Sequence, residues 1–205
     1  MKFIATSTLA LCIITGCSKR EPSFDELKSK VQESVKAGDY SNAKKQLDAM
    51  LRLRTNDFDT LVSRGGVAIF LGDAASAEAD FGAAAVIDKE KAAKARFFFA
   101  DRATWAAREH DVKKRYQEAL AIYNCLLTLY PKSGTAYHER GGVKTEMNDY
   151  RGAIDDLTKA IELDDGNNSH GDSYVLRARA KRAMGDVKGA QDDEALASTR
   201  ASKSK

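Results

Sequence analysis

Apolar and polar residues alternate along most of the chain with the spacing of amphipathic helices. In the stretch YRGAIDDLTKAIE, for example, the apolar residues Leu157, Ala160 and Ile161 recur at helical spacing. The chain contains only two prolines, Pro22 and Pro131, so long helices are allowed almost everywhere between them. Ser23 to Glu26 read as a capping box for the first helix, and Pro131 ends an earlier helix at Tyr130. The pattern predicts an all-helical protein.

The first residues differ from the rest of the chain. Lys2 precedes an apolar run from Phe3 to Ile14, and small residues follow as far as Cys17. The run is shorter than the about 20 residues that a membrane-spanning helix needs. Its charged start, apolar centre and small-residue end are typical of a secretory signal peptide.

The end of this segment, Ile14-Thr15-Gly16-Cys17, resembles the lipobox of bacterial lipoproteins. The resemblance implies that residues 1–16 are removed as a signal peptide, that Cys17 carries the lipid, and that residues 17–23 form a short linker. Two or three acyl chains anchor a protein firmly, whereas one binds only marginally. Ser18 favours the outer membrane, facing the periplasm, where the host has two membranes. The alternative is a plain secretory signal that happens to contain a cysteine.

Turn residues recur at regular distances. GDY begins at Gly38, GDA at Gly72, NDY at Asn148 and GDV at Gly185. The successive distances of 34, 76 and 37 residues correspond to a period of 34, with eight extra residues in one repeat and three in another. The stretch RGGV also occurs twice, at residues 64–67 and 140–143.

This period, together with the turn, resembles the tetratricopeptide repeat family. Residues 134–167 carry the family pattern almost throughout, with a small residue at repeat position 8, the turn at 15–17 and alanines at 20 and 27. The resemblance implies an all-α, right-handed superhelical solenoid of about five helix–turn–helix repeats. They are expected at residues 24–57, 58–91, 92–133, 134–167 and 171–204, with residues 201–205 as a mobile tail.

The RGGV stretches have two possible meanings. A phosphate-binding loop needs glycines that open a helix, usually followed by Lys and Ser or Thr, and neither copy has that continuation. The glycines are therefore interpreted as small residues at a close helix crossing, where a side chain would push the helices apart. The same packing role is expected for a set of small residues at equivalent positions, namely Gly65, Ala77, Gly141, Ala153, Ala160, Ala178 and Ala190.

The third repeat is longer than the others. Its eight extra residues are close to two helical turns, so both of its helices would be lengthened by about one turn. The alternative is an irregular loop near Glu109–Lys113. Its first helix also contains Phe97, Phe98, Phe99 and Trp105. Three consecutive aromatic residues cannot all point inward, so one of them is a candidate for a binding surface.

No catalytic arrangement is visible in the sequence. The net charge of +3 comes from interspersed basic and acidic residues, which gives no footprint for nucleic acid. The three histidines are isolated, Cys125 lies in an apolar helix, and the acidic loop 164–172 lacks the final glutamate of a calcium loop. We therefore expect no enzyme activity, no metal, no cofactor and no small-molecule substrate.

Function is then expected on a surface, with one or more proteins as partners. In the family, positions on the first helix of each repeat line a concave groove that holds peptides or helices. Those positions are occupied by Val62, Ile69, Phe70, His138, Thr145, Glu146, Val175, Arg179 and Arg182. Asp192, Asp193 and Glu194 in the last helix are expected to face water and close the solenoid.

Together, these features predict a membrane-anchored adaptor or scaffold that binds proteins in the bacterial cell envelope. The alternative is an obligate structural subunit of an envelope assembly machine, of the pilus, secretin or outer-membrane type.

Overall fold

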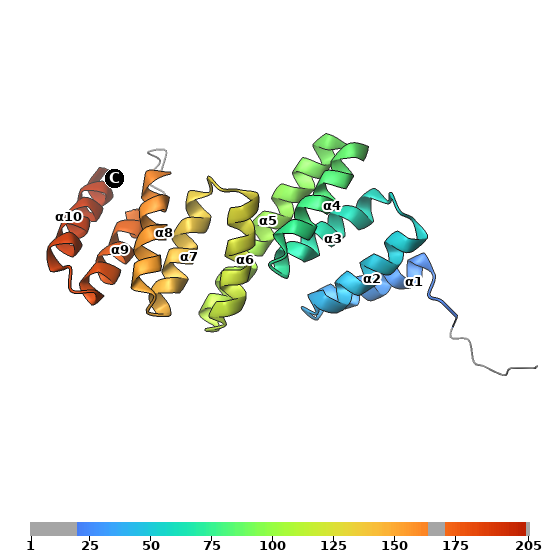
Figure 1. Ribbon diagram of the computed structural model, residues 1–205, viewed down its shortest axis with the longest axis horizontal. Coiled ribbons are helices and arrows are strands. Elements are labelled where there is room, and N and C mark those ends of the chain that lie inside the picture. Colours follow the sequence, from blue (N-terminus) through green and yellow to red (C-terminus); the bar gives the residue numbers. More distant parts are fainter. Residues whose placement is uncertain (1–19, 164–170, 204–205) are drawn as a thin grey trace, which may run out of the picture.

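Ten α-helices and no strand make up the part of the chain that the computed structural model describes, residues 20–163 and 171–203 (Figure 1). The first helices of the five pairs are α1 (Phe24–Lys36), α3 (Phe58–Phe70), α5 (Lys89–Val112), α7 (Gly134–Glu146) and α9 (Gly171–Ala183). The second helices are α2 (Tyr40–Leu53), α4 (Ala74–Ile87), α6 (Tyr116–Leu129), α8 (Tyr150–Glu162) and α10 (Val187–Lys203). The pairs stand side by side along the long axis, so the predicted all-α solenoid of five helix pairs is confirmed.

The turn inside each helix pair contains one residue with a positive φ angle. Gly38, Gly72 and Gly185 adopt φ angles of 74°, 74° and 87°, and Asn148 adopts 62°. Lys114, at 57°, takes the same place in the third pair. Glycine and asparagine tolerate this left-handed conformation best, which explains why these residues mark the period in the sequence.

The first glycine of each RGGV stretch lies in the middle of a helix, at the crossing with its partner helix. A Cβ atom on Gly65 would lie 3.1 Å from the Phe81 ring, and one on Gly141 would lie 2.7 Å from Cγ of Leu157. The other small residues at predicted crossings are fully or almost fully buried, namely Ala77, Ala153, Ala160, Ala178 and Ala190. Both stretches thus lie inside helices, α3 and α7, and neither opens one.

The second glycine of each stretch has a different environment in the two copies. In α3, the ring of Phe99 from α5 occupies the space that a Cβ on Gly66 would need. In α7, the nearest atom to a Cβ on Gly142 would be Cδ1 of Leu176, at 3.7 Å, which is an ordinary contact. Gly66 therefore admits α5 to the surface of α3, whereas Gly142 leaves room for a side chain.

The arginine of RGGV forms a bridge that links two repeats. Arg64 donates from Nε and Nη2 to the carboxylate of Asp80 at 2.9 and 2.6 Å, and from Nη1 to Asp48 at 2.8 Å. Asp80 belongs to the second helix of the same pair and Asp48 to the preceding pair. The same three hydrogen bonds run from Arg140 to Asp156 and Asn124, and from Arg177 to Asp193 and Thr158. We call each such unit an arginine rung.

The aspartate of each rung is buried, with a side chain only 2% to 6% exposed. Lys144 adds a second cation to Asp156 at 2.7 Å, and Lys181 adds one to Asp193 at 2.9 Å. Burial by itself would raise the pKa of Asp193, but the hydrogen bonds from Arg177 and Lys181 outweigh it and hold that pKa below its usual range. The prediction that Asp193 faces water is wrong, because the carboxylate closes the last rung; Asp192 and Glu194 are exposed.

The extra residues of the third repeat all enter its first helix. Helix α5 has 24 residues, 11 more than the 13 of α1, α3, α7 and α9, which corresponds to about three turns. Helix α6 keeps 14 residues, and the region near Glu109–Lys113 continues the helix as far as Val112. Both expectations for this insertion are therefore wrong. At the other end of the chain, α10 includes residues 201–203, which had been expected in the tail.

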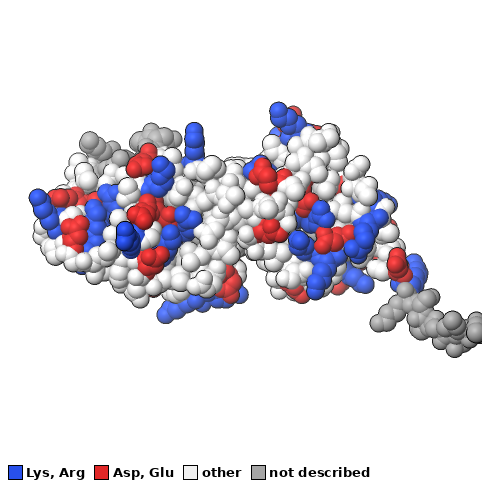
Figure 2. Space-filling model, in the orientation of Figure 1, with Lys and Arg blue, Asp and Glu red and all other residues white. Residues whose placement is uncertain are grey.

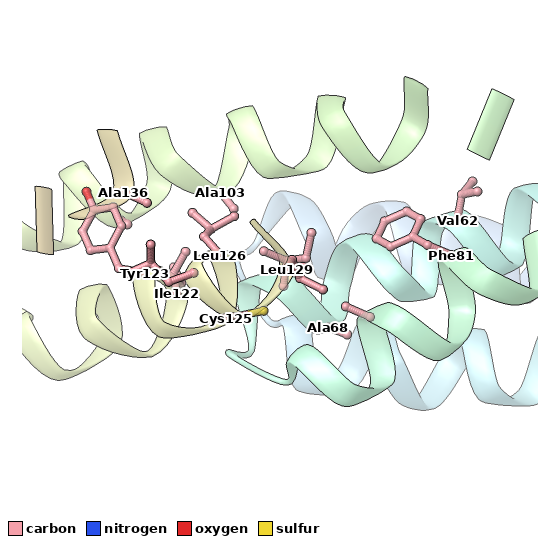
Figure 3. Packing of buried hydrophobic residues seen from close by; sticks show 14 of the residues in the cluster. Val62, Ala68, Phe81, Ala103, Ile122, Tyr123, Cys125, Leu126, Leu129 and Ala136 are labelled. Carbon is pink, nitrogen blue, oxygen red and sulfur yellow. The ribbon is translucent and has the colours of Figure 1, made fainter. Parts of the chain in front are cut away.

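Helix α5 connects the two halves of the core. It contacts α3 and α4 on the one side and α6 and α7 on the other. The largest cluster of buried apolar side chains runs continuously through this region, from Val62 and Phe81 to Ile122, Tyr123 and Leu126 (Figure 3). Alanines such as Ala103 and Ala107, both fully buried, let the long helix approach α6 closely.

Removing the arginine of a rung is predicted to destabilise the protein by an amount that depends on the second cation. Asp80 has no other ion-pair partner among the described residues, whereas Asp156 keeps Lys144. Arg64→Met should therefore cost about 3–5 kcal/mol, the range for an uncompensated buried charge. Arg140→Met should cost less, about 1–3 kcal/mol. Urea denaturation of the two variants measures the difference, and equal losses would mean that the lysine contributes nothing.

The two second glycines of RGGV form a matched pair for mutation. Gly66→Ala places a methyl group where the Phe99 ring lies, and this overpacking should destabilise the protein by about 1–3 kcal/mol. Gly142→Ala makes only an ordinary contact with Leu176 and should stabilise α7 by up to about 1 kcal/mol, because alanine favours the helix. Thermal melting of both variants tests this, and stabilisation by Gly66→Ala would contradict the close contact with α5.

Candidate protein-binding groove

An open groove of about 720 Å³ lies where α5 meets the end of α6 and the start of α7. Its floor is apolar and buried, and comprises Leu126, Leu129 and Ala136. Phe97 and Trp105 of α5 form part of its wall and remain 71% and 63% exposed. Large aromatic side chains left in water beside a buried apolar floor are typical of a protein-binding site.

The lengthened helix α5 produces this wall. Phe97, Asp101, Thr104, Trp105 and Arg108 follow one another at intervals of three and four residues or as direct neighbours, so they occupy one face of the helix. Phe99 points the other way, against the Phe81 ring at a centroid distance of 6.4 Å. Of the three consecutive phenylalanines, one therefore enters the core and two are exposed.

The charged residues of the groove fall into two groups. Arg108 donates from Nε to Glu139 of α7 at 2.8 Å, and its guanidinium lies 5.3 Å from the centre of the Trp105 ring. This hydrogen bond raises the pKa of Arg108, so its guanidinium stays charged. Asp101 and Lys132 also line the groove, and within the described chain neither has an ion-pair partner. A partner segment therefore meets one free acid and one free base.

The nearby titratable groups are not arranged for catalysis. The Tyr123 hydroxyl is fully buried and burial raises its pKa, while burial raises the pKa of the Cys125 thiol to about 11. Both groups thus remain protonated at neutral pH. Among the described residues, no three His, Cys, Asp or Glu side chains are grouped so that they could hold a metal ion.

Three of the residues predicted to line a concave groove are buried. Val62 is 8% exposed and Ile69 is fully buried, both within the main core cluster. Thr145 is 1% exposed and donates its hydroxyl to the backbone oxygen of Gly141 at 2.9 Å. The prediction for these three is wrong, because neighbouring helices cover the positions that the family register places at the surface.

The other predicted groove residues do not form one surface. Phe70 is half-buried and stacks on Tyr40 at 4.6 Å, and Nδ1 of His138 lies 2.7 Å from the hydroxyl of the buried Ser173. The exposed members are Glu146, Val175, Arg179 and Arg182. Arg179 pairs with Glu146 at 2.7 Å, whereas Arg182 pairs with Glu194 of α10 at 2.7 Å. The two arginines thus point to different helices.

The sequence contained a signal for the observed groove, in the aromatic run at residues 97–99. The 34-residue pattern could not assign these aromatic residues to a face of the helix, because the insertion makes the alignment of the third repeat ambiguous. Cys17 and most of the acidic loop, residues 164–170, lie outside the described residues.

The surface in Figure 2 also bears on the kind of partner. Basic and acidic side chains are interspersed over both halves of this face, and a largely uncharged band separates them over α6. Helix α6 itself, YQEALAIYNCLLTL, contains Glu118 as its one charged residue. This face therefore lacks the continuous basic patch that a nucleic acid would require.

The sequence model described as tetratricopeptide repeat matches residues 134–167, which contain Arg140, Gly141 and Asp156. No curated protein sequence matches the chain. Among solved structures, MamA from Desulfovibrio magneticus is 18% identical, covering 88% of this chain and 96% of that one at a TM-score of 0.46. A tetratricopeptide repeat protein from Parabacteroides merdae is 20% identical, covering 88% and 66% at 0.42. The complex of the TPR2AB domain of yeast Sti1 with pHSP90 contains a chain 18% identical, covering 89% and 80% at 0.47.

Proposed function

We propose that this protein is an adaptor that binds a segment of another protein in the groove between α5, α6 and α7. The observation that carries the proposal is the exposure of Phe97 and Trp105 above the buried floor of Leu126, Leu129 and Ala136. Binding is favoured when a partner covers exposed aromatic side chains, because their apolar surface is removed from water. Such residues dominate the binding energy of protein interfaces.

The lining of the groove indicates what the bound segment contains. One or two large apolar side chains would fill the space between the aromatic wall and the floor. A basic residue would meet Asp101 and an acidic residue would meet Lys132, both of which are exposed. Arg108 and Glu139 neutralise each other, so they favour an uncharged stretch of the segment between these two ends.

We further propose that the adaptor is held at a membrane of the bacterial envelope by a lipid on Cys17. The support is the lipobox-like sequence ending at that residue. No helix in the described part of the chain is both long enough and apolar enough to pass through a bilayer.

An obligate structural subunit of an envelope assembly machine is the second candidate. The exposed apolar residues outside the groove, among them Val86 at 88% and Val112 at 82%, favour it. A subunit of this kind would aggregate without its neighbours, whereas an adaptor remains stable alone.

Replacing the lipidated cysteine should release the protein from the membrane. In cells that express Cys17→Ala, we expect the protein to move from the membrane pellet to the soluble fraction after carbonate extraction. The matched control is Cys125→Ala, which removes a buried thiol of the folded helices and should leave fractionation unchanged. Full retention of the Cys17→Ala protein after carbonate treatment would contradict the lipid anchor.

The groove can be tested with a photo-crosslinking amino acid at position 97 and, as a control, at position 86 on α4. Partners captured from position 97 alone identify the bound segment, which is then titrated as a synthetic peptide. Trp105 is the one tryptophan of the chain, so its fluorescence reports binding directly.

Phe97→Ala should weaken binding of that peptide about tenfold or more, as expected for an aromatic anchor. Phe98→Ala changes the neighbouring residue, which does not line the groove, and should alter the affinity by less than about twofold. Equal effects of the two substitutions would contradict the proposed site.

A further inference from the structure

A second line of exposed residues runs along α5 and overlaps the groove wall at Asp101 and Trp105. Phe98 and Trp105 are seven residues apart, hence on the same side of the helix, and are 54% and 63% exposed. Charged residues continue this side in both directions at intervals of three and four. We call the whole set the outer stripe, which comprises the exposed residues Lys94, Phe98, Asp101, Arg102, Trp105 and Glu109.

The outer stripe is complementary to itself when two copies run antiparallel. With a twofold axis between residues 101 and 102, position 94 faces position 109 of the other copy, 98 faces 105, and 101 faces 102. Lys94 then meets Glu109, Phe98 meets Trp105, and Asp101 meets Arg102. Every charged pair is opposite in sign and the aromatic residues meet at the same level. A parallel arrangement would instead place each charge against its own kind.

We propose that the outer stripe of α5 pairs with the outer stripe of a second copy of this chain. An interface of this symmetry is isologous, since the same patch is used on both protomers. The length of α5 supports the proposal, because its 24 residues exceed those of every neighbouring helix and provide three heptads of continuous surface.

Existing contacts of the stripe do not compete strongly with this pairing. Lys94 pairs with Glu90 and Glu109 with Lys113, each within α5 and four residues apart, and all four side chains are more than half exposed. Arg102 lies 5.7 Å from the centre of the Phe98 ring, and Asp101 has no ion-pair partner in the described structure. Exposed pairs at this spacing hold weakly, so each charge remains available to the second copy.

A membrane surface is a less suitable binding partner for the outer stripe than a second copy of the chain. Asp101 and Glu109 would be carried toward anionic lipid headgroups together with the aromatic residues, which opposes binding. Because a single helix per protomer supplies the contact, we expect a reversible dimer that depends on protein concentration, rather than an obligate one.

The test uses the full chain, in a mild detergent with a large excess of micelles, and measures dimerisation by sedimentation equilibrium. Lys94→Glu and Glu109→Lys each create two like-charge contacts in the symmetric dimer and should weaken self-association about tenfold or more. A mixture of the two variants restores both opposite-charge contacts and should dimerise as well as the wild type. The double variant Lys94→Glu/Glu109→Lys should likewise regain wild-type association.

The rescue by mixing separates this pairing from a general loss of folding, since each single variant must be folded to form the mixed dimer. A wild-type chain that stays monomeric up to high micromolar concentrations would overturn the proposal. Rescue that fails, or charge reversals without effect on the dimer, would overturn the antiparallel register. Asp101 and Trp105 belong to both the groove and the outer stripe, so a groove peptide and the second copy compete for them. Phe98→Ala should weaken the dimer while leaving the affinity of the monomer for a groove peptide unchanged, so failure here is distinguishable from failure of the proposed function.

Discussion

The structure depends on a buried carboxylate that must be paired. In each arginine rung, an aspartate side chain that is at most 6% exposed receives two parallel hydrogen bonds from an arginine of the partner helix. A charge in this position is tolerated only with such a partner, because the interior cannot solvate it. The third hydrogen bond of the arginine reaches the preceding repeat. One side chain therefore sets both the crossing within a pair and the stacking between pairs.

The third pair is the one place among the described pairs from α3 to α10 where this device is replaced. Ala106 and Ile122 stand 16 residues apart, as Arg64 and Asp80 do, and both belong to the main apolar cluster, so apolar residues take the places of a rung in the third pair. Without a rung, α5 is held by its buried alanines, by Phe99 against Gly66, and by the ion pairs Arg96–Glu78 and Arg108–Glu139. In this register the 11 additional residues of α5 precede Ala100, at the N-terminal end of the helix. They include Phe97 and Phe98, whereas Trp105 takes the place that Ser63 has in the second pair.

The two RGGV stretches have the same sequence but different neighbours in the structure. Arginine and the first glycine act alike in both copies, since the rung and the close crossing recur within each helix pair. The second glycine faces the next first helix along the solenoid. In one copy that neighbour brings the Phe99 ring, and in the other it brings Leu176 at an ordinary distance. A repeated motif is thus equivalent only as far as its neighbours are equivalent.

The sequence alone determined the helical class, the five helix pairs and the turns, because these follow from local periodicity and from residues that favour a positive φ angle. The small residues at the crossings were also recognisable, since their spacing repeats. Tertiary structure decided what depends on residues far apart in the chain. Asp193 was expected in water because its neighbours are acidic, yet Arg177, 16 residues earlier, brings it inside. Val62, Ile69 and Thr145 were expected at a surface that adjacent helices cover. Phe97 in the groove wall belongs to an insertion whose residues have no counterpart in the repeat, so only the packing of α5 against α3, α6 and α7 could reveal which of its aromatic side chains stay exposed.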